Sequence, residues 1–185
     1  KVQGAPLEVT RNNLSDGMAK VVICNSGNAN TCNANGIELA QKMCQLVAKE
    51  LEVNPQDVIV ASTGVIGQPL PLGPIAQGIP PLVKSLSRDG GSDAGKAIMT
   101  TDLIEKEVAV EFTLGDKVCK IGAVAKGSGM IHPNMATMLG FITTDVDIST
   151  KMLHKALVLT VEDSFHMVSV DGDTSTNDMV AIMAN

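Results

Sequence analysis

The order of apolar segments between residues 20 and 61 constrains the fold more than any other feature of the sequence. A β-branched run at residues 20–24 predicts a buried strand that leads into a turn-rich segment at 25–30. Residues 57–61 predict a second buried strand, ending on residues 62–67. Between them, residues 36–51 have apolar residues at spacings of three and four, which indicates one buried helix face formed by Ile37, Ala40, Met43, Cys44, Val47 and Leu51.

The second half of the chain adds an antiparallel element. Residues 106–113 and 118–125 alternate in polarity around a turn and predict a hairpin, with Val108, Val110 and Phe112 on one side. Prolines between residues 68 and 91 permit only short helices, placed at 75–86 and 93–99. A strand is expected at 138–143. Ser149 is expected to cap a helix running to about Phe165, with a buried stripe of Met152, Leu153, Ala156, Leu157 and Val161.

Helices and strands are therefore mixed without strict alternation. This favours an α+β fold, a layered sandwich with mixed β-sheets flanked by helices, over a doubly wound parallel sheet. The 185 residues contain no internal repeat and no recognisable linker, so we expect a single domain over residues 1–185. The chain begins without Met and without a signal-like run, and we expect it to be part of a longer reading frame.

Charge and aromatic content exclude one class of partner. The chain has 14 basic and 20 acidic residues, a net charge of -6, and its only aromatic residues are three Phe. A nucleic-acid reader needs a basic surface and usually stacking rings, so no nucleic-acid partner is expected. Residues 58–83 form an uncharged stretch of 26 residues, but five Pro and four Gly make a membrane-spanning helix there improbable. We expect no membrane association.

The familiar motifs for metals, phosphates and nucleophile elbows are missing. The sequence has no Gly-x-Ser-x-Gly, no Gly-x-x-x-x-Gly-Lys-Ser/Thr and no His-Glu-x-x-His. The four cysteines are spaced by 8, 12 and 75 residues, which matches no zinc or redox motif, and the three histidines do not form a ligand set. No metal and no organic cofactor are expected.

The most informative segment is residues 126–139, Lys-Gly-Ser-Gly-Met-Ile-His-Pro-Asn-Met-Ala-Thr-Met-Leu. Its glycines, Pro133 and Asn134 tolerate unusual backbone angles, and they precede a strand that opens at Thr137. By itself this pattern is typical of a loop that delivers a hydroxyl to a strand edge. A threonine at the head of a strand is ordinary.

This segment resembles the self-cleavage site of the ornithine acetyltransferases, also called glutamate N-acetyltransferases. Four other segments extend the resemblance over nearly the whole chain, at residues 25–30, 62–67, 100–102 and 170–178. The resemblance implies an N-terminal-nucleophile-like, self-processing fold. It also implies autoproteolysis between Ala136 and Thr137, giving chains 1–136 and 137 onward.

The resemblance assigns roles to five residues. Thr137 would be the catalytic nucleophile, carrying an acetyl group from N-acetylornithine to glutamate in a ping-pong cycle, with its freed α-amino group as the base. Thr63 and Gly64 would form the oxyanion-stabilising pair, and are therefore also catalytic. Thr100 and Lys126 would bind substrate together with Thr137.

The resemblance also implies partners. Family members are longer at both ends, so the remaining part of the β chain is expected as a partner, with further substrate contacts beyond Asn185. A heterotetramer of two α and two β chains is expected, in the cytoplasm and in arginine biosynthesis. Acetyl-CoA serves as a second acetyl donor in some relatives, and nothing in this chain decides its use.

Two alternatives to acetyl transfer stay open. The same self-generated nucleophile could serve an amidase or aminopeptidase with water as the acceptor. A non-catalytic binding module that keeps the loop and never cleaves is the second. Residues 173–178 lie within the resemblance, but their capping side chains predict a helix start ahead of the apolar residues 179–183, so they are not assigned to the site.

Overall fold

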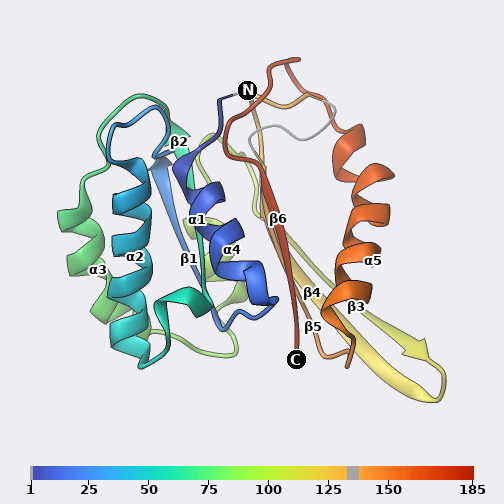
Figure 1. Ribbon diagram of the computed structural model, residues 1–185. Coiled ribbons are helices and arrows are strands. Elements are labelled where there is room, and N and C mark those ends of the chain that lie inside the picture. Colours follow the sequence, from blue (N-terminus) through green and yellow to red (C-terminus); the bar gives the residue numbers. More distant parts are fainter. Residues whose placement is uncertain (1, 133–137) are drawn as a thin grey trace. The chain divides into compact units, whose positions relative to one another are not determined.

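The computed structural model describes residues 2–132 and 138–185, which fall into two compact units, unit 1 (residues 1–90) and unit 2 (residues 91–185) (Figure 1). Each unit has its own β-sheet, and each is described by itself. Ala136 and Thr137 lie outside the described residues. The single domain and the cut between Ala136 and Thr137 remain predictions.

Unit 1 confirms the expected strand, helix, strand order and adds a helix before it. Its elements are α1 (Ala5–Asn13), β1 (Val21–Asn28), α2 (Gly36–Leu51), β2 (Val58–Val65) and α3 (Leu72–Lys84), with 3-10 turns at Leu14–Asp16 and Pro55–Asp57. β1 and β2 pair in parallel from Val21 opposite Val58 to Asn28 opposite Val65. Both strands therefore end at the same edge of the sheet.

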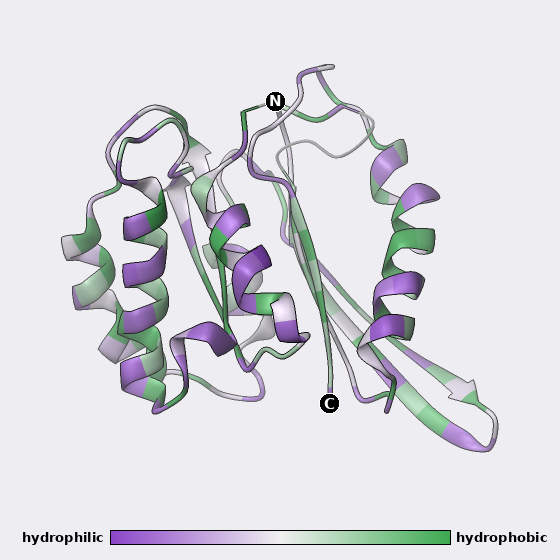
Figure 2. Cartoon of the chain, in the orientation of Figure 1, coloured by the Kyte–Doolittle hydropathy of each residue, from purple (hydrophilic) through white to green (hydrophobic). Residues whose placement is uncertain are grey.

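The core of unit 1 forms where α2 packs against β1, β2, α1 and α3. Ala40, Met43, Cys44 and Val47 are buried as the helical spacing predicts, and Figure 2 shows apolar and polar residues on different sides of α2. Ile37, at the helix start, was expected in the buried stripe but is 41% exposed. The stripe therefore holds in the middle of the helix, where neighbours cover it.

Helix α1 completes the edge of β2 that β1 does not pair. The Thr10 hydroxyl donates to the Val60 carbonyl (2.7 Å) and accepts from the Val60 N–H (2.8 Å). Asn13 Nδ2 donates to the Val58 carbonyl at 2.8 Å. A buried strand edge needs partners for its polar backbone groups, and two side chains from one helix face supply them here.

Unit 2 contains α4 (Gly91–Ala97), β3 (Lys106–Leu114), β4 (Lys117–Lys126), β5 (Leu139–Thr144), α5 (Thr150–Glu162) and β6 (Met179–Ala184), with a 3-10 turn at Phe165–Met167. Its sheet has the order β3-β4-β5-β6. The first two pairings are antiparallel and β5 pairs with β6 in parallel. The expected α+β class with a mixed sheet and flanking helices is confirmed.

The predicted helix start at residues 173–178 is wrong. Residues 179–184 form strand β6, which pairs with β5 from Leu139 opposite Met179 to Thr144 opposite Ala184. The Asp178 side chain does accept from a backbone N–H, as such residues favour, but that N–H belongs to Met138 in a loop rather than to a helix terminus. The residue types therefore predicted correctly that these side chains bind backbone N–H groups, but the helix that they predicted is a strand.

The expected buried stripe of α5 is largely wrong. Of the five residues, only Val161 is buried, while Met152 is 51% exposed and Ala156 is also exposed. Within unit 2, α5 packs on β6 and on the turn Phe165–Met167. Ser149 occupies the N-cap position as predicted, but its side chain makes no capping hydrogen bond.

The hairpin of β3 and β4 is confirmed, with register from Lys106 opposite Ala125 to Leu114 opposite Lys117. Its apolar side is nevertheless not buried within unit 2, since Val108 is 57% exposed and Val110 is 50% exposed. Figure 2 shows hydrophobic residues along this hairpin.

We expect Thr10→Val to lower the free energy of unfolding of unit 1 by about 1–3 kcal/mol, because it leaves both backbone groups of Val60 without their partner while keeping the side-chain shape. Urea denaturation followed by circular dichroism measures this change. Thr10→Ser is the control, since it retains the hydroxyl. Equal stability of the valine and serine variants would contradict the proposed role of this hydroxyl.

Candidate functional site

The predicted site residues are divided between the two units. Thr63 and Gly64 lie at the end of β2 in unit 1, while Thr100 and Lys126 lie in unit 2. The structure brings Thr100 and Lys126 into contact, and Thr63 and Gly64 are neighbours in the chain.

Gly64 lies at a point where two backbones come unusually close. It pairs with Gly27 of β1, and both residues have positive φ angles, +129° and +101°. A Cβ at position 64 would lie 2.3 Å from the Gly27 carbonyl carbon and 2.6 Å from the Asn28 nitrogen. No side chain fits at this separation, and the φ angle disfavours any residue other than glycine.

The residues before Gly64 are buried and tied to the end of β1. Ser62 and Thr63 are 1% and 2% exposed. The Ser62 hydroxyl donates to Asn25 Oδ1 at 2.6 Å, and Asn25 Nδ2 donates to the Asn28 carbonyl at 2.9 Å. These bonds fix the last residues of β1 against the end of β2, so the hydroxyl-bearing segment at 62–64 is held on rigid elements.

Lys126 is a buried ammonium, 1% exposed, at the last position of β4. Its Nζ donates to Thr100 Oγ1 at 2.8 Å, and its backbone pairs with Leu139 at the start of β5. A buried lysine is costly unless its charge is bonded, so such residues are rarely present for packing alone. Lys126 thus presents an oriented cation beside the segment that leads to Thr137.

Asp102 holds the loop between α4 and β3, which carries Thr100. Its carboxylate accepts from Gly127 N–H (2.8 Å), Thr100 N–H (3.3 Å) and Lys106 Nζ (2.7 Å). Burial opposes ionisation of this carboxyl, but the bonds from Lys106, Gly127 and Thr100 outweigh it and lower the pKa of Asp102 below its ordinary value. Asp102 belongs to the segment 100–102 of the resemblance, which assigns it no role.

Two further carboxylates that sequence reasoning missed bind the backbone before and after residues 132–137 in the chain. Asp171 accepts from Met130 N–H (2.6 Å) and Ile131 N–H (2.9 Å), and these bonds lower its pKa. Asp178 accepts from Met138 N–H at 2.8 Å. Burial raises the pKa of Asp178 to about 6, against the opposing effects of the Met138 bond, the Ser175 side chain and the Lys126 charge. The apolar residues 179–184 were the signal that could have located Asp178. They fit a strand as well as a helix, and the strand that they form pairs with β5, which follows Met138.

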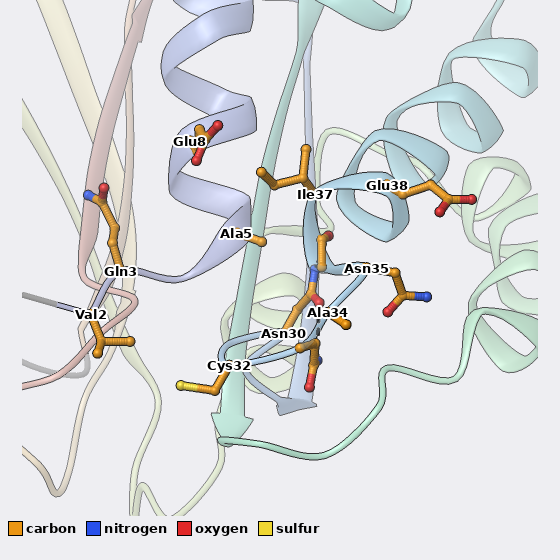
Figure 3. A pocket seen from close by; sticks show the side chains of 12 residues that line it. Val2, Gln3, Ala5, Glu8, Asn30, Cys32, Ala34, Asn35, Ile37 and Glu38 are labelled. Atoms are coloured by element: carbon orange, nitrogen blue, oxygen red, sulfur yellow. Dashed lines mark hydrogen bonds between the residues drawn. The ribbon is translucent and has the colours of Figure 1, made fainter.

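A hollow of about 450 Å³ lies in unit 1 around the start of α2 (Figure 3). Side chains of Asn30, Cys32 and Glu38 contribute to it, together with residues before and within α1. None of the described residues predicted for the site lines this hollow.

The described part of the chain has neither a cluster of metal-binding side chains nor a membrane-spanning helix. Within residues 2–132 and 138–185, no group of three or more His, Cys, Asp or Glu side chains is arranged to hold a metal ion. The helices in those same ranges are all too short or too polar to cross a bilayer.

Comparison with known proteins gives consistent relatives. The ArgJ family matches residues 1–185. The arginine biosynthesis bifunctional protein ArgJ of Symbiobacterium thermophilum is 49% identical over 185 residues, covering 100% of this chain and 46% of the relative. The protein of the same name from Prochlorococcus marinus is 51% identical over 163 residues, covering 88% of this chain and 40% of the relative. The chain thus spans less than half the length of these relatives.

Two solved structures share the fold. A crystal structure of the arginine biosynthesis bifunctional protein ArgJ from Bacillus halodurans aligns with a TM-score of 0.67 and 40% identity, over 74% of this chain and 72% of that chain. The ornithine acetyltransferase of Mycobacterium tuberculosis, complexed with ornithine, aligns with a TM-score of 0.68 and 35% identity, over 74% and 73%.

We expect the Asp178 carboxyl to titrate with a midpoint near pH 6 and the Asp171 carboxyl below its ordinary range, because burial dominates the first and N–H bonds the second. Carboxyl ¹³C NMR titration measures both in one sample. Since the raised pKa means that the folded state holds the Asp178 proton more tightly, its stabilisation is complete below about pH 3.8 and is lost as pH rises through 6. Relative to Asp178→Asn, the wild type should therefore lose stability as the pH rises from about 3.8 through about 6. A constant difference would contradict the burial of this carboxyl.

Proposed function

Because the chain belongs to the ArgJ family, we propose that the protein is an acetyltransferase of arginine biosynthesis that cleaves itself and then moves an acetyl group from N-acetylornithine to glutamate. The observation that carries the proposal is the contact of 2.8 Å between the buried Lys126 ammonium and Thr100, two residues matching substrate-binding positions of the family. A relative with bound ornithine supports a substrate of this type.

The first step of the proposal creates the nucleophile. The Thr137 hydroxyl oxygen attacks the Ala136 carbonyl carbon, forming a C–O bond as the C–N bond between the two residues breaks. The hydroxyl proton passes to the Thr137 nitrogen, which becomes an α-amino group. Water then hydrolyses the ester, releasing the Ala136 carboxylate and restoring the hydroxyl. The products are the chain 1–136 and a chain beginning with Thr137.

The second step uses the new amine as a base. A free α-amino group has a pKa of about 7.7–8.0, so a useful fraction is unprotonated near neutral pH and can take the proton from the hydroxyl of the same residue. The hydroxyl attacks the acetyl carbonyl of N-acetylornithine, and ornithine leaves with the proton. The amine of glutamate then takes the acetyl group from the threonine ester.

Each transfer passes through a tetrahedral oxyanion, for which we assign Thr63 and Gly64 as donors. The burial of Thr63 and the rigid pairing of Gly64 with Gly27 support this assignment, since preorganised donors in a dry environment stabilise such an intermediate most strongly. The Gly64 donor is a backbone N–H and the Thr63 donor is a hydroxyl.

Lys126 and Thr100 are assigned to substrate recognition. An ammonium is suited to an amino-acid carboxylate, and the bond to Thr100 restricts its position. Asp102 supports the pair, because it holds the backbone of both Thr100 and Gly127.

The proposal extends to partners and location. The relatives are named bifunctional, and for the second activity we propose N-acetylglutamate synthesis with acetyl-CoA as the acetyl donor. We also propose a heterotetramer of two α and two β chains, with the remaining part of the β chain supplying the other substrate contacts. Arginine biosynthesis supports a cytoplasmic location.

Thr137→Ala should leave the protein uncleaved and inactive, because the attacking oxygen is gone. Denaturing mass spectrometry of the wild type should show the fragment 1–136 and a remainder beginning with threonine. Thr137→Ser keeps a hydroxyl and should still cleave. Cleavage of the alanine variant at the wild-type position would refute the assignment of the nucleophile, and a wild type of full mass would support an uncleaved binding module.

Thr63→Val should lower kcat about 100- to 1000-fold with the protein folded, because one oxyanion donor is lost. Thr63→Ser restores the hydroxyl and should recover most of the rate. The assay follows isotope-labelled acetyl from N-acetylornithine. Label in N-acetylglutamate supports transfer, whereas label found only as free acetate would support the amidase alternative. Unchanged turnover in the valine variant would place the donor elsewhere.

A further inference from the structure

We propose that the loop of residues 171–178, named here the anchoring loop, positions the self-cleavage segment by holding its two flanks, with Asp171 bound upstream and Asp178 bound downstream of the bond between Ala136 and Thr137. This inference rests on the proposed self-cleavage and assigns two positioning residues to it. The anchoring loop connects the end of the α5 region to strand β6.

The upstream flank is bound through both polar groups of Ile131. Its N–H donates to Asp171 Oδ1 at 2.9 Å, and its carbonyl accepts from Val170 N–H (2.9 Å) and Gly172 N–H (3.3 Å). The neighbouring Met130 N–H donates to Asp171 Oδ2 at 2.6 Å. Both oxygens of Asp171 are therefore used, and the backbone at 130–131 is fixed in position and direction.

The downstream flank is bound in the same manner through Met138. Its N–H donates to Asp178 Oδ1 at 2.8 Å, and its carbonyl accepts from Met179 N–H at 3.0 Å. The next residue, Leu139, opens β5 and pairs with Met179 of β6. The residue that follows Thr137 is thus held by a side chain and by the start of a strand.

The two anchors have equal spacing. Ile131 and Met138 are seven residues apart, and so are Asp171 and Asp178. At both Ile131 and Met138, an aspartate carboxylate accepts from the backbone N–H, and the backbone N–H of a residue next to that aspartate donates to the carbonyl. Asp171 and Asp178 therefore bind described backbone on both sides of the predicted cut, residues 130–131 before it and residue 138 after it.

Local geometry around Asp171 indicates a tightly fitted contact. Met130 has a φ of +58°, a backbone angle that L residues rarely adopt. A Cβ at Gly129 would lie 3.4 Å from Asp171 Oδ2, and Gly172 has a φ of +78°. The N–H bonds from Met130 and Ile131 lower the pKa of Asp171, and the carboxylate is ionised near neutral pH, so these bonds are charge-assisted.

Anchoring matters because of the reaction proposed. Attack of a hydroxyl on the carbonyl of the preceding residue needs one backbone geometry, and each free residue adds conformations that do not react. Fixing residues 131 and 138 removes the motion of both ends before the reaction begins. Removing one of the two aspartate side chains should therefore slow cleavage strongly while lowering the stability of the fold only slightly.

The two carboxylates predict different responses to the same substitution. Asp178 uses one oxygen for Met138, so asparagine can keep that bond. Asp171 uses one oxygen for Met130 and the other for Ile131, and asparagine has a single oxygen acceptor. We therefore expect Asp178→Asn to rescue the defect of Asp178→Ala, while Asp171→Asn rescues Asp171→Ala only in part.

The test measures the half-time of precursor cleavage in the complete protein by pulse-chase translation and denaturing mass spectrometry. Asp171→Ala and Asp178→Ala should each lengthen the half-time about tenfold or more, and Asp178→Asn should stay within about threefold of wild type. Asp173→Asn is the matched control from the same loop, and it should cleave at the wild-type rate. Wild-type half-times for both alanine variants would overturn the proposal.

Two measurements separate this inference from its alternatives. If Thr137→Ala cleaves like the wild type, the proposed function fails; if it stays intact while the anchor variants cleave normally, only the anchoring role fails. The same aspartate substitutions are then made in the Thr137→Ala background, where melting temperatures should change by only a few degrees. Loss of folding there, or equal effects of alanine and asparagine at position 178, would reduce Asp178 to a structural role and overturn the proposal.

Discussion

Polar backbone groups that have no partner in a helix or a sheet need one elsewhere, and short polar side chains supply it near several of the candidate residues. Thr10 and Asn13 bind the outer edge of β2, which carries Thr63 and Gly64. Asp102 binds the backbone of Thr100, and Asp178 that of Met138. Because an unpaired buried N–H or carbonyl is costly, these bonds hold the backbone in place.

The buried ammonium of Lys126 adds an electrostatic constraint within unit 2. Its charge favours the ionised form of Asp178, whose pKa is nevertheless raised by burial, and its Nζ binds Thr100. Since Lys126 ends β4 and faces Leu139 of β5, its position depends on the register of these two strands. A shift of one residue would turn the side chain to the other face of the sheet. The substrate recognition that we propose for this lysine therefore depends on sheet pairing as much as on loop chemistry.

Sequence patterns predicted the parts of the fold that local periodicity determines. The strand, helix, strand order of unit 1 and the hairpin of β3 and β4 were correct, because each has a clear period and clear turn residues. β6 was missed because six apolar residues fit a strand or a helix equally well, and only pairing with β5 decides between them. The exposure of Met152 on α5 was missed for a related reason, since periodicity shows which face is apolar but not what covers it.

The candidate site shows the same division between local and long-range information. Thr100 and Lys126 were assigned from the resemblance, and their contact spans 26 positions that no local pattern connects. Asp178 was interpreted as a capping residue and Asp171 was given no role, since their partners lie about 40 positions earlier in the chain. Local sequence could identify side chains that favour binding backbone N–H groups, but the pairing of β5 with β6 determines which groups they bind.

The pairing of β5 with β6 also bears on what happens after the proposed cut. Met138 would stay bound to Asp178 and Met179, and Ile131 to Asp171, Val170 and Gly172, since none of these bonds involves the broken peptide. Both new chains would therefore remain attached to one loop near their new ends. A nucleophile created by cleavage needs its neighbours to keep their positions, and bonds that are independent of the scissile peptide meet that need. The same contacts can thus serve the precursor and the mature enzyme.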